Sequence, residues 1–385
     1  MMSIEREATS IEGAEAILAP YTLGSLQLRN RVVMSPMTRG RTESEDRAPG
    51  ILEAEYYAQR ASAGLIITGG TYISPQSIGS MRVPGIYSDQ QVEAWKRVTG
   101  AVHENGGRIF LQIAHSGSIS HPDLHGGKLP VAPSAINPQQ KVFTLTGFKD
   151  TVTPRSLDID EIQDIVDDYG HAAKNAREAG FDGVELHAAH SYLLPQFLSS
   201  VTNHRKDIYG ISPEGRARLV LEALESITNH WEKSRIGIKL SPGLNGLGAF
   251  VANDDTLPTY DYLFGELNRF SPGYVHLMRP INDVSGTVVA NLQEGTYKRY
   301  RPMFNGTLIA NVGFDGKSAN ELIAGGDADL VSFARHYIAN PDLPERFRQN
   351  VPLVEGDLAT YYQGRAVGFT SYPPYEEREA AVTSR

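Results

Sequence analysis

The stretch GVELHAAHSY, residues 183–192, gathers side chains that can polarise an oxygen atom and transfer a proton. Its short apolar start predicts a buried strand. Because side chains alternate along a strand, Glu185 and His187 share one face. His190 and Tyr192 follow directly, so two imidazoles and a phenol are expected to meet where the strand ends. Neutral imidazole N–H groups stabilise negative charge on an oxygen atom, and a phenol, with a reference pKa of about 10, can donate a proton at neutral pH.

Two other interpretations of these histidines remain open. Histidines in strands are often hydrogen-bonded core residues with no chemical role. Alternatively, His187, His190 and Glu185 could bind a metal ion, as in a metal-dependent hydrolase or lyase. The second interpretation needs a further ligand on the correct face, and Glu185 is expected to point into the interior below His187.

Short apolar segments alternate along the chain with longer amphipathic ones. Repeated strand–helix alternation predicts parallel strands. Eight such strands favour a single (β/α)8 TIM barrel, with a doubly wound open sheet as the alternative. In such a barrel the chemistry lies at the carboxyl ends of the strands. The expected strands cover residues 31–36, 65–73, 108–115, 183–189, 235–242, 274–280, 308–313 and 330–335.

The clearest helical pattern follows Asp158, where Glu161 completes a capping box and Gly180 ends the helix. Two connections, 116–157 and 243–258, are longer than a barrel needs, and we expect these extended loops to lie over the C-terminal face. The expected helices cover residues 52–63, 89–104, 158–179, 213–231, 259–270 and 318–324.

Composition narrows the classes of function. The net charge of −9 argues against non-specific binding to nucleic acid. The absence of cysteine excludes disulfides, thiolate metal sites and a cysteine nucleophile, and it fits the cytoplasm. There is no apolar run of the roughly 20 residues that span a membrane. We expect residues 1–17 to form a flexible arm without the features of a signal peptide, 18–375 to form the barrel, and 376–385 to form a loose tail.

A second signal lies near the end of the chain. The seventh expected strand ends in Asn311-Val312-Gly313, and the eighth ends in Ala334-Arg335. The loops after these two strands commonly bind phosphate in TIM barrels, through backbone N–H groups and an arginine fork. Taken alone, Arg335 would fit a surface ion pair better, but within a barrel the phosphate role is favoured.

Together these motifs resemble those of the Old Yellow Enzymes, which are FMN-containing ene-reductases. The resemblance covers about 18–375, and the motifs occur in the family's order. They are LRNRVVMSPMTR (28–39), GLIITGGTYISPQ (64–76), GRIFLQIAHSG (107–117), APSAI (132–136), NAREAGFDGVELHAAHSYLLPQFLS (175–199), GIKLSPG (237–243), LIANVGF (308–314) and DLVSFARHYIANPDLPERF (329–347).

The resemblance implies a role for each matching residue. His187 and His190 would bind the carbonyl or nitro oxygen of the substrate, Tyr192 would donate the proton, and Tyr372 would lean over the pocket. FMN would bind non-covalently, with Thr38 tuning its potential. The other implied FMN contacts are Pro36, Met37, Gly70, Gln112 and His187 at the ring, Lys239 beside N1, and Val312, Gly313, Ala334 and Arg335 at the phosphate.

The resemblance also implies the reaction. NADPH (or NADH) would reduce the flavin, which would pass hydride from N5 to the Cβ atom of an activated alkene, while Tyr192 protonates Cα. The substrates would be α,β-unsaturated carbonyls, nitroalkenes or maleimides. The enzyme would be a monomer or homodimer, with no nucleic-acid or membrane partner. A flavin-binding protein with a sensing or scavenging role is the alternative.

Three residues depart from the family pattern. Lys239 replaces the usual arginine, which keeps the positive charge but loses the bidentate fork. Ala114 and Ser80 stand where the family often has Trp and Tyr, which predicts a wider pocket. The absence of cysteine separates the chain from the related dienoyl-CoA reductases, which carry an iron–sulfur cluster.

Overall fold

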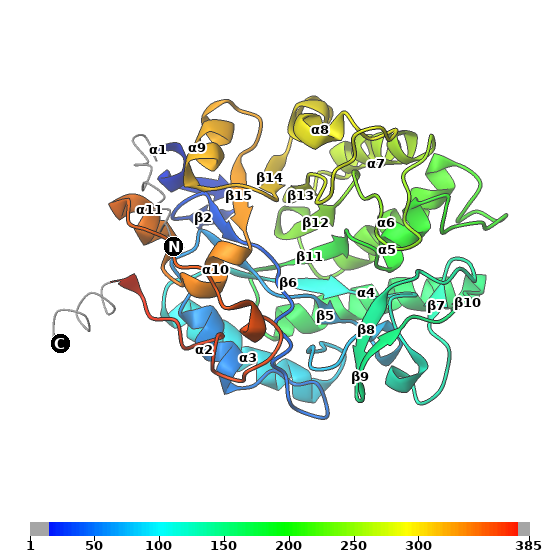
Figure 1. Ribbon diagram of the computed structural model, residues 1–385, viewed down its shortest axis with the longest axis horizontal. Helices are drawn as coiled ribbons and strands as arrows, with labels where there is room; N and C mark the ends of the chain where they lie inside the picture. Colours follow the sequence, from blue (N-terminus) through cyan, green and yellow to red (C-terminus); the bar gives the residue numbers. More distant parts are fainter. Residues whose placement is uncertain (1–14, 376–385) are drawn as a thin grey trace, which may run out of the picture.

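A closed barrel of parallel strands forms the centre of the molecule, as the sequence predicts (Figure 1). The computed structural model describes residues 15–375. The last barrel strand pairs with the first through Val331 and Val32, which closes the sheet. The eight barrel strands of the described chain are β3 (Val32–Met34), β4 (Leu65–Ile67), β6 (Ile109–Ala114), β11 (Gly183–Ala188), β12 (Ile236–Leu240), β13 (Tyr274–Met278), β14 (Thr307–Asn311) and β15 (Leu330–Phe333).

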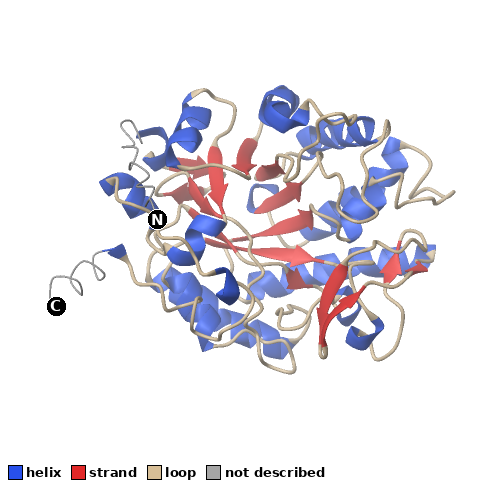
Figure 2. Ribbon diagram, in the orientation of Figure 1, coloured by secondary structure: helices blue, strands red, loops and turns tan. Residues whose placement is uncertain are grey.

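Helices surround the barrel (Figure 2). The predicted capping box is present, because Glu161 accepts a hydrogen bond from the backbone N–H of Asp158 at 2.9 Å. All six predicted helices form, although α2 ends five residues early. The helices are α1 (Glu15–Leu18), α2 (Ile51–Ala58), α3 (Asp89–Glu104), α4 (Ile159–Glu178), α5 (Leu193–Leu198), α6 (Pro213–Thr228), α7 (Thr256–Phe270), α8 (Leu292–Tyr300), α9 (Gly316–Ala324), α10 (Arg335–Ala339) and α11 (Leu343–Gln349).

The barrel interior changes from apolar to polar towards the carboxyl ends of its strands. At the opposite end, a hairpin of β1 (Tyr21–Leu23) and β2 (Leu26–Leu28) packs Leu23 and Leu28 against inward-facing side chains such as Phe110. The next inward positions along β6 and β11 hold Gln112 and Glu185. This alternation lets the apolar half stabilise the fold while the polar half forms the floor of a site.

The long connection after β6 carries its own small strands, as expected for a segment over the C-terminal face. The prominent feature is the hairpin of β8 (Lys141–Thr144) and β9 (Gly147–Asp150), which Figure 1 shows projecting beside the barrel. The same connection holds β7 (Val131–Ala132) and β10 (Arg155–Ser156), whereas the short strand β5 (Thr71–Tyr72) lies between β4 and β6.

A segment near the end of the chain, residues 357–370, lies over the same face, and we call it the strap. Two buried arginines hold it through its backbone carbonyls. Arg39 donates to Tyr361 at 2.9 Å and to Gly368 at 2.7 Å. Arg41 donates to Arg365 at 2.9 Å. The strap is therefore fixed by the residues that directly follow the first barrel strand.

The structure corrects one boundary of the expected arm. Residues 15–17 belong to α1, where Ile17 is fully buried and the backbone N–H groups of Ala16 and Ile17 donate to Asn320. The rest of that arm, 1–14, and the expected tail, 376–385, lie outside the described residues. In the part of the chain that the structure describes, no helix is long and apolar enough to cross a membrane.

Candidate active site

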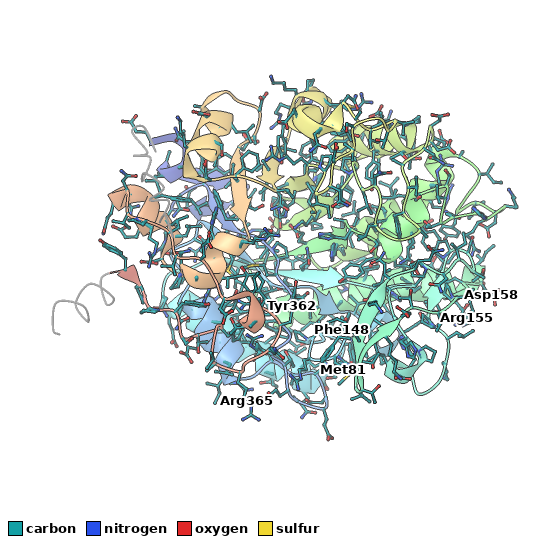
Figure 3. All side chains as sticks on the ribbon, viewed as in Figure 1. Met81, Phe148, Arg155, Asp158, Tyr362 and Arg365 are labelled. Carbon is teal, nitrogen blue, oxygen red and sulfur yellow. The ribbon has the colours of Figure 1, made fainter. Side chains whose placement is uncertain are left out.

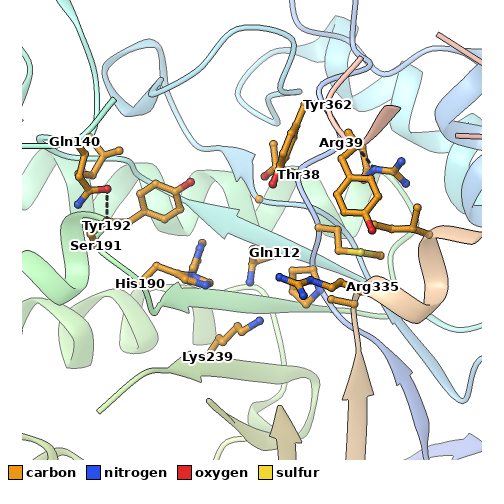
Figure 4. A pocket seen from close by; sticks show the side chains of 18 of the residues that line it. Thr38, Arg39, Gln112, Gln140, His190, Ser191, Tyr192, Lys239, Arg335 and Tyr362 are labelled. Carbon is orange, nitrogen blue, oxygen red and sulfur yellow. Dashed lines mark hydrogen bonds between the residues drawn. The ribbon is translucent and has the colours of Figure 1, made fainter. Parts of the chain in front are cut away.

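A cavity of about 700 Å³ opens at the carboxyl ends of the barrel strands (Figure 4). Most of the side chains predicted for cofactor and substrate line it, although they come from segments up to 300 positions apart. These residues are Pro36, Met37, Thr38, Gly70, Gln112, His187, His190, Tyr192, Lys239, Ala334 and Arg335.

Three rings from one segment form one side of the cavity. The ring centroids of His187 and His190 lie 5.5 Å apart, with an angle of 89° between the planes. Tyr192 lies 4.9 Å from His187, also at about a right angle, 90°. The end of β11 and the turn after it therefore bring two N–H donors and one O–H donor to the same space.

The turn after β11 requires an uncommon backbone conformation at His190. Its φ is +59°, in the left-handed region, where histidine, asparagine and aspartate are enriched among residues other than glycine. The backbone N–H of His190 donates to the hydroxyl of Ser241 at 2.9 Å, which ties the turn to the end of β12. This conformation directs the side chain of His190 into the cavity.

Burial sets the protonation states of the three rings. It lowers the pKa of His190 to about 3 and places the pKa of His187 well below its ordinary value, with the neighbouring charge of Lys239 adding to both shifts. Burial also raises the pKa of the Tyr192 phenol. At neutral pH both imidazoles are neutral and the phenol keeps its proton, so all three remain hydrogen-bond donors.

Lys239 brings a positive charge to the floor of the cavity. It lies opposite His187 in the register of β11 and β12, and its ammonium group is 3.4 Å from the hydroxyl of Ser35. Burial lowers the pKa of Lys239 to about 8, and the nearby carboxylate of Glu185 opposes this shift. The group is thus mostly charged at neutral pH, as required of a residue that stabilises an anion.

The cavity floor also fits a flat ring with polar edges. A Cβ atom on Gly70 would lie 3.5 Å from Gln112 Oε1 and 3.9 Å from His187 Cδ2, so a larger side chain there would fill the floor. His187 Nδ1 is buried and has no hydrogen-bond partner among the described residues. An unpaired buried polar atom is costly, so a ligand that pairs with it would be favoured. These features suit an isoalloxazine ring.

At the predicted phosphate end, the structure supports only part of the expectation. Arg335 and Ala334 line the cavity, and Arg335 is exposed without a hydrogen-bond or ion-pair partner in the described chain. Val312 and Gly313 do not line it. Arg279 lies against them instead, donating to the carbonyl oxygen of Gly313 at 3.0 Å. The loop after β14 is therefore covered by an arginine that no pattern in the sequence indicates.

The predicted aromatic lid residue is not the one that the structure places at the site. Tyr372 lies outside the cavity lining, and its hydroxyl accepts a hydrogen bond from the backbone N–H of Asp357 at 2.9 Å. Tyr361 and Tyr362 of the strap line the cavity in its place. Two consecutive tyrosines in the sequence could have indicated an aromatic wall. However, the strap has no periodic pattern that would show where it lies in the fold.

A second chamber of about 650 Å³ continues outward from the first, between the β8–β9 hairpin and the strap. Met81, Phe148 and Tyr362 lie on this side of the molecule (Figure 3). Ser80 lines the chamber, as a pocket-wall position should. Ala114 lines neither chamber and is buried at the end of β6.

The polar side chain below the histidines has partners of its own. Glu185 is fully buried and bonds to Gln112 at 2.7 Å and to His276 at 2.9 Å. Among residues 15–375, no group of three or more His, Cys, Asp or Glu side chains is arranged to hold a metal ion.

Comparisons with known proteins agree with this geometry. A sequence model of the NADH:flavin oxidoreductase / NADH oxidase family matches residues 16–353. The 12-oxophytodienoate reductase 1 of Oryza sativa subsp. japonica is 41% identical over 369 residues, which cover 94% of this chain and 93% of the relative.

Solved structures show the same fold. Morphinone reductase in complex with tetrahydroNAD is 44% identical with a TM-score of 0.86, and the match covers 93% of this chain and 97% of that one. The Old Yellow Enzyme homologue from Zymomonas mobilis is 37% identical with a TM-score of 0.87, covering 93% and 99%. The chain therefore belongs to the NADH:flavin oxidoreductase family of Old Yellow Enzymes and is a flavin-dependent oxidoreductase.

Proposed function

We propose that this protein is an FMN-dependent ene-reductase that uses NADPH to reduce the C=C bond of activated alkenes. The observation that carries the proposal is the perpendicular arrangement of His187 with His190 and Tyr192 beside a cavity suited to a flat ring. The substrate class is alkenes conjugated to a carbonyl, nitro or imide group, because two neutral N–H donors bind such an oxygen without losing a proton.

The roles of the three rings follow from their protonation states. His187 and His190 would hold the electron-withdrawing oxygen and stabilise the negative charge that develops on it. Tyr192 would protonate the alkene carbon next to the electron-withdrawing group. A phenol suits this step because burial keeps Tyr192 protonated until a strongly basic carbon is formed beside it.

The cavity residues would hold the cofactor without a covalent bond. Lys239 would face the part of the ring that becomes negative on reduction, Thr38 would bond to the ring edge, and Arg335 would bind the phosphate. FMN, when bound, supplies the hydride that no side chain of this protein can carry. We assign the ring contacts to Pro36, Met37, Gly70, Gln112 and His187, and the phosphate end to Ala334, Arg335 and the backbone near Val312 and Gly313.

The outer chamber supports NADPH as the reductant. Arg82 lines this chamber, and its exposed side chain has no bonding partner among the described residues. A free guanidinium suits the extra phosphate that distinguishes NADPH from NADH. Replacing Arg82 with Gln should lower the ratio of kcat/KM for NADPH over NADH, whereas an unchanged ratio would contradict this assignment.

Anaerobic titration tests the proposal as a whole. The purified protein should be yellow, NADPH should bleach it, and an enone, nitroalkene or maleimide should restore the colour with one equivalent of reduced product. A colourless protein, or a bleached protein that none of these acceptors re-oxidises, would contradict it. From the lack of cysteine, we further propose a cytoplasmic enzyme, acting as a monomer or homodimer on small molecules.

A further inference from the structure

A chain of buried hydrogen bonds lies directly below the cavity and passes through Glu185. Its carboxylate accepts from Gln112 Nε2 at 2.7 Å and bonds to His276 Nδ1 at 2.9 Å. His276 Nε2 bonds in turn to the hydroxyl of Ser332 at 2.7 Å, and Asn311 Nδ2 donates to that hydroxyl at 2.7 Å. The five side chains come from four barrel strands, β6, β11, β13 and β15, and from the end of β14.

The charge on Glu185 fixes the direction of the hydrogen bonds that it forms. An ionised carboxylate accepts and cannot donate, so Gln112 and His276 must both donate to Glu185. His276 therefore carries its proton on Nδ1 and accepts at Nε2. The Ser332 hydroxyl donates to this nitrogen at 2.7 Å in preference to the more distant carbonyl oxygen of Ala310, at 3.1 Å. Burial lowers the pKa of His276 to about 4, which fits one proton on its ring at neutral pH. His276, Lys239 and Gln112 outweigh burial and keep the pKa of Glu185 below its ordinary value.

This direction fixes the amide of Gln112. Its nitrogen is committed to Glu185, so its oxygen is the atom left for the cavity, which Gln112 lines. Consistent with this, Gln112 Oε1 lies 3.5 Å from the position that a Cβ atom on Gly70 would take in the cavity floor. The floor therefore offers an acceptor at this point, and a ligand that binds there must bring a donor.

We propose that Glu185 is a positioning residue that holds the Gln112 amide with its oxygen towards the cavity, so that the site selects a ring edge carrying an N–H donor. The inference rests on the proposed FMN binding, because the pyrimidine edge of the isoalloxazine carries one such N–H group between two carbonyls. Glu185 acts through Gln112 and does not itself touch the cavity.

Glu185→Gln keeps the shape of the side chain but reverses the direction of its hydrogen bond with Gln112. His276 Nδ1–H would pair with the new amide oxygen, leaving the new amide nitrogen facing Gln112. Gln112 would then turn to accept and would present its own NH2 group to the cavity. The NH2 group of Gln112 would then face the N–H group of the flavin ring edge. Two donors cannot form a hydrogen bond with each other, so FMN would bind more weakly.

The experiment measures Kd for FMN and for N3-methyl-FMN by the quenching of flavin fluorescence in the apoprotein. Wild type should prefer FMN by about tenfold, the scale of one buried hydrogen bond. Glu185→Gln should bind FMN more weakly and lose that preference. Gln112→Ala should also lose it, and adding Glu185→Gln to Gln112→Ala should change the preference no further. Ser332→Ala is the matched control and should keep it, because Glu185 retains both donors.

The outcomes separate this inference from the proposed function. Wild-type protein that does not bind FMN would overturn both. Wild-type protein that binds FMN without a preference, or a Gln112→Ala variant that keeps the preference, would overturn the inference alone, and the latter test holds even if Glu185→Gln does not fold. A folded Glu185→Gln variant with an unchanged preference would also overturn it.

Discussion

His190 reaches its place beside His187, 5.5 Å away and at 89°, only because its backbone adopts a left-handed conformation with φ of +59°. The position therefore needs both a side-chain N–H donor and a residue that tolerates this backbone. Asparagine meets both needs, whereas valine meets neither.

We predict that His190→Asn keeps substantial enone reduction and a wild-type free energy of unfolding. His190→Val should lose activity by about 100-fold, the scale of one lost oxyanion donor. It should also be destabilised by about 1–3 kcal/mol because a branched residue is strained there. Steady-state kinetics and urea unfolding measure the two effects. Equal activity of the two variants would show that His190 does not bind the substrate oxygen.

Arg41 holds the strap in place over the cavity, and this leads to a second prediction. The Arg41 guanidinium donates to carbonyl groups of the strap and lies 5.1 Å from the ring centre of Phe369. Arg41→Ala should destabilise the protein by about 2–3 kcal/mol, since buried charge-assisted hydrogen bonds are lost. KM for alkenes should rise severalfold, because Tyr361 and Tyr362 would no longer be held at the cavity.

Arg365→Ala provides the matched control in the same strap. This side chain is 79% exposed, and its one ion-pair partner among the described residues is the exposed Glu43, an interaction of little value in water. Its stability and KM should stay close to wild type. If Arg41→Ala and Arg365→Ala had the same effects on stability and KM, Arg41 would not position the strap.

Lys239 predicts how the stability of the flavin-free protein depends on pH. Burial lowers its pKa to about 8 from the ordinary 10.5, so between these values the unfolded chain binds more protons than the folded one. The contribution of Lys239 to stability must then rise with pH in this window, by at most about 1.4 kcal/mol per pH unit. Below the folded pKa both states are charged, and the cost of burying the ammonium group is constant.

Urea unfolding of the apoprotein at about pH 7.5 and about pH 9.5 measures this rise, in a range below the ordinary tyrosine pKa. Lys239→Met should be more stable than wild type at the lower pH. Its free energy of unfolding should show little of the increase with pH that wild type shows. Lys174→Met, at an exposed position of α4, should keep it. A rise of the same size in Lys239→Met would mean that another group produces it.

Local patterns in the sequence predicted the barrel and most of its site. The alternation in GVELHA places Glu185 and His187 inward, and the capping box at Asp158 marks the start of α4 as expected. Both signals depend on neighbours along the chain, where hydrophobic period and capping act directly. Family motifs then pointed to single residues that line the cavity, such as Gln112.

The outer wall of the site could not be predicted in this way. The strap is held by side-chain bonds from Arg39 and Arg41 to backbone carbonyls more than 300 positions away, and its own sequence has no periodicity. For this reason the sequence points to Tyr372, whereas Tyr361 and Tyr362 line the cavity. Arg279, which covers Gly313, was missed for a similar reason, since only the barrel closure brings the two loops together.

The central claim is that Tyr192 donates the proton to the alkene, and the two half-reactions test it directly by rapid mixing. In Tyr192→Phe, reduction of the bound flavin by NADPH should proceed at nearly the wild-type rate. Re-oxidation of the reduced enzyme by 2-cyclohexenone should slow by about 100-fold or more, the usual contribution of a general acid. Re-oxidation at the wild-type rate, with formation of the saturated ketone, would contradict the account.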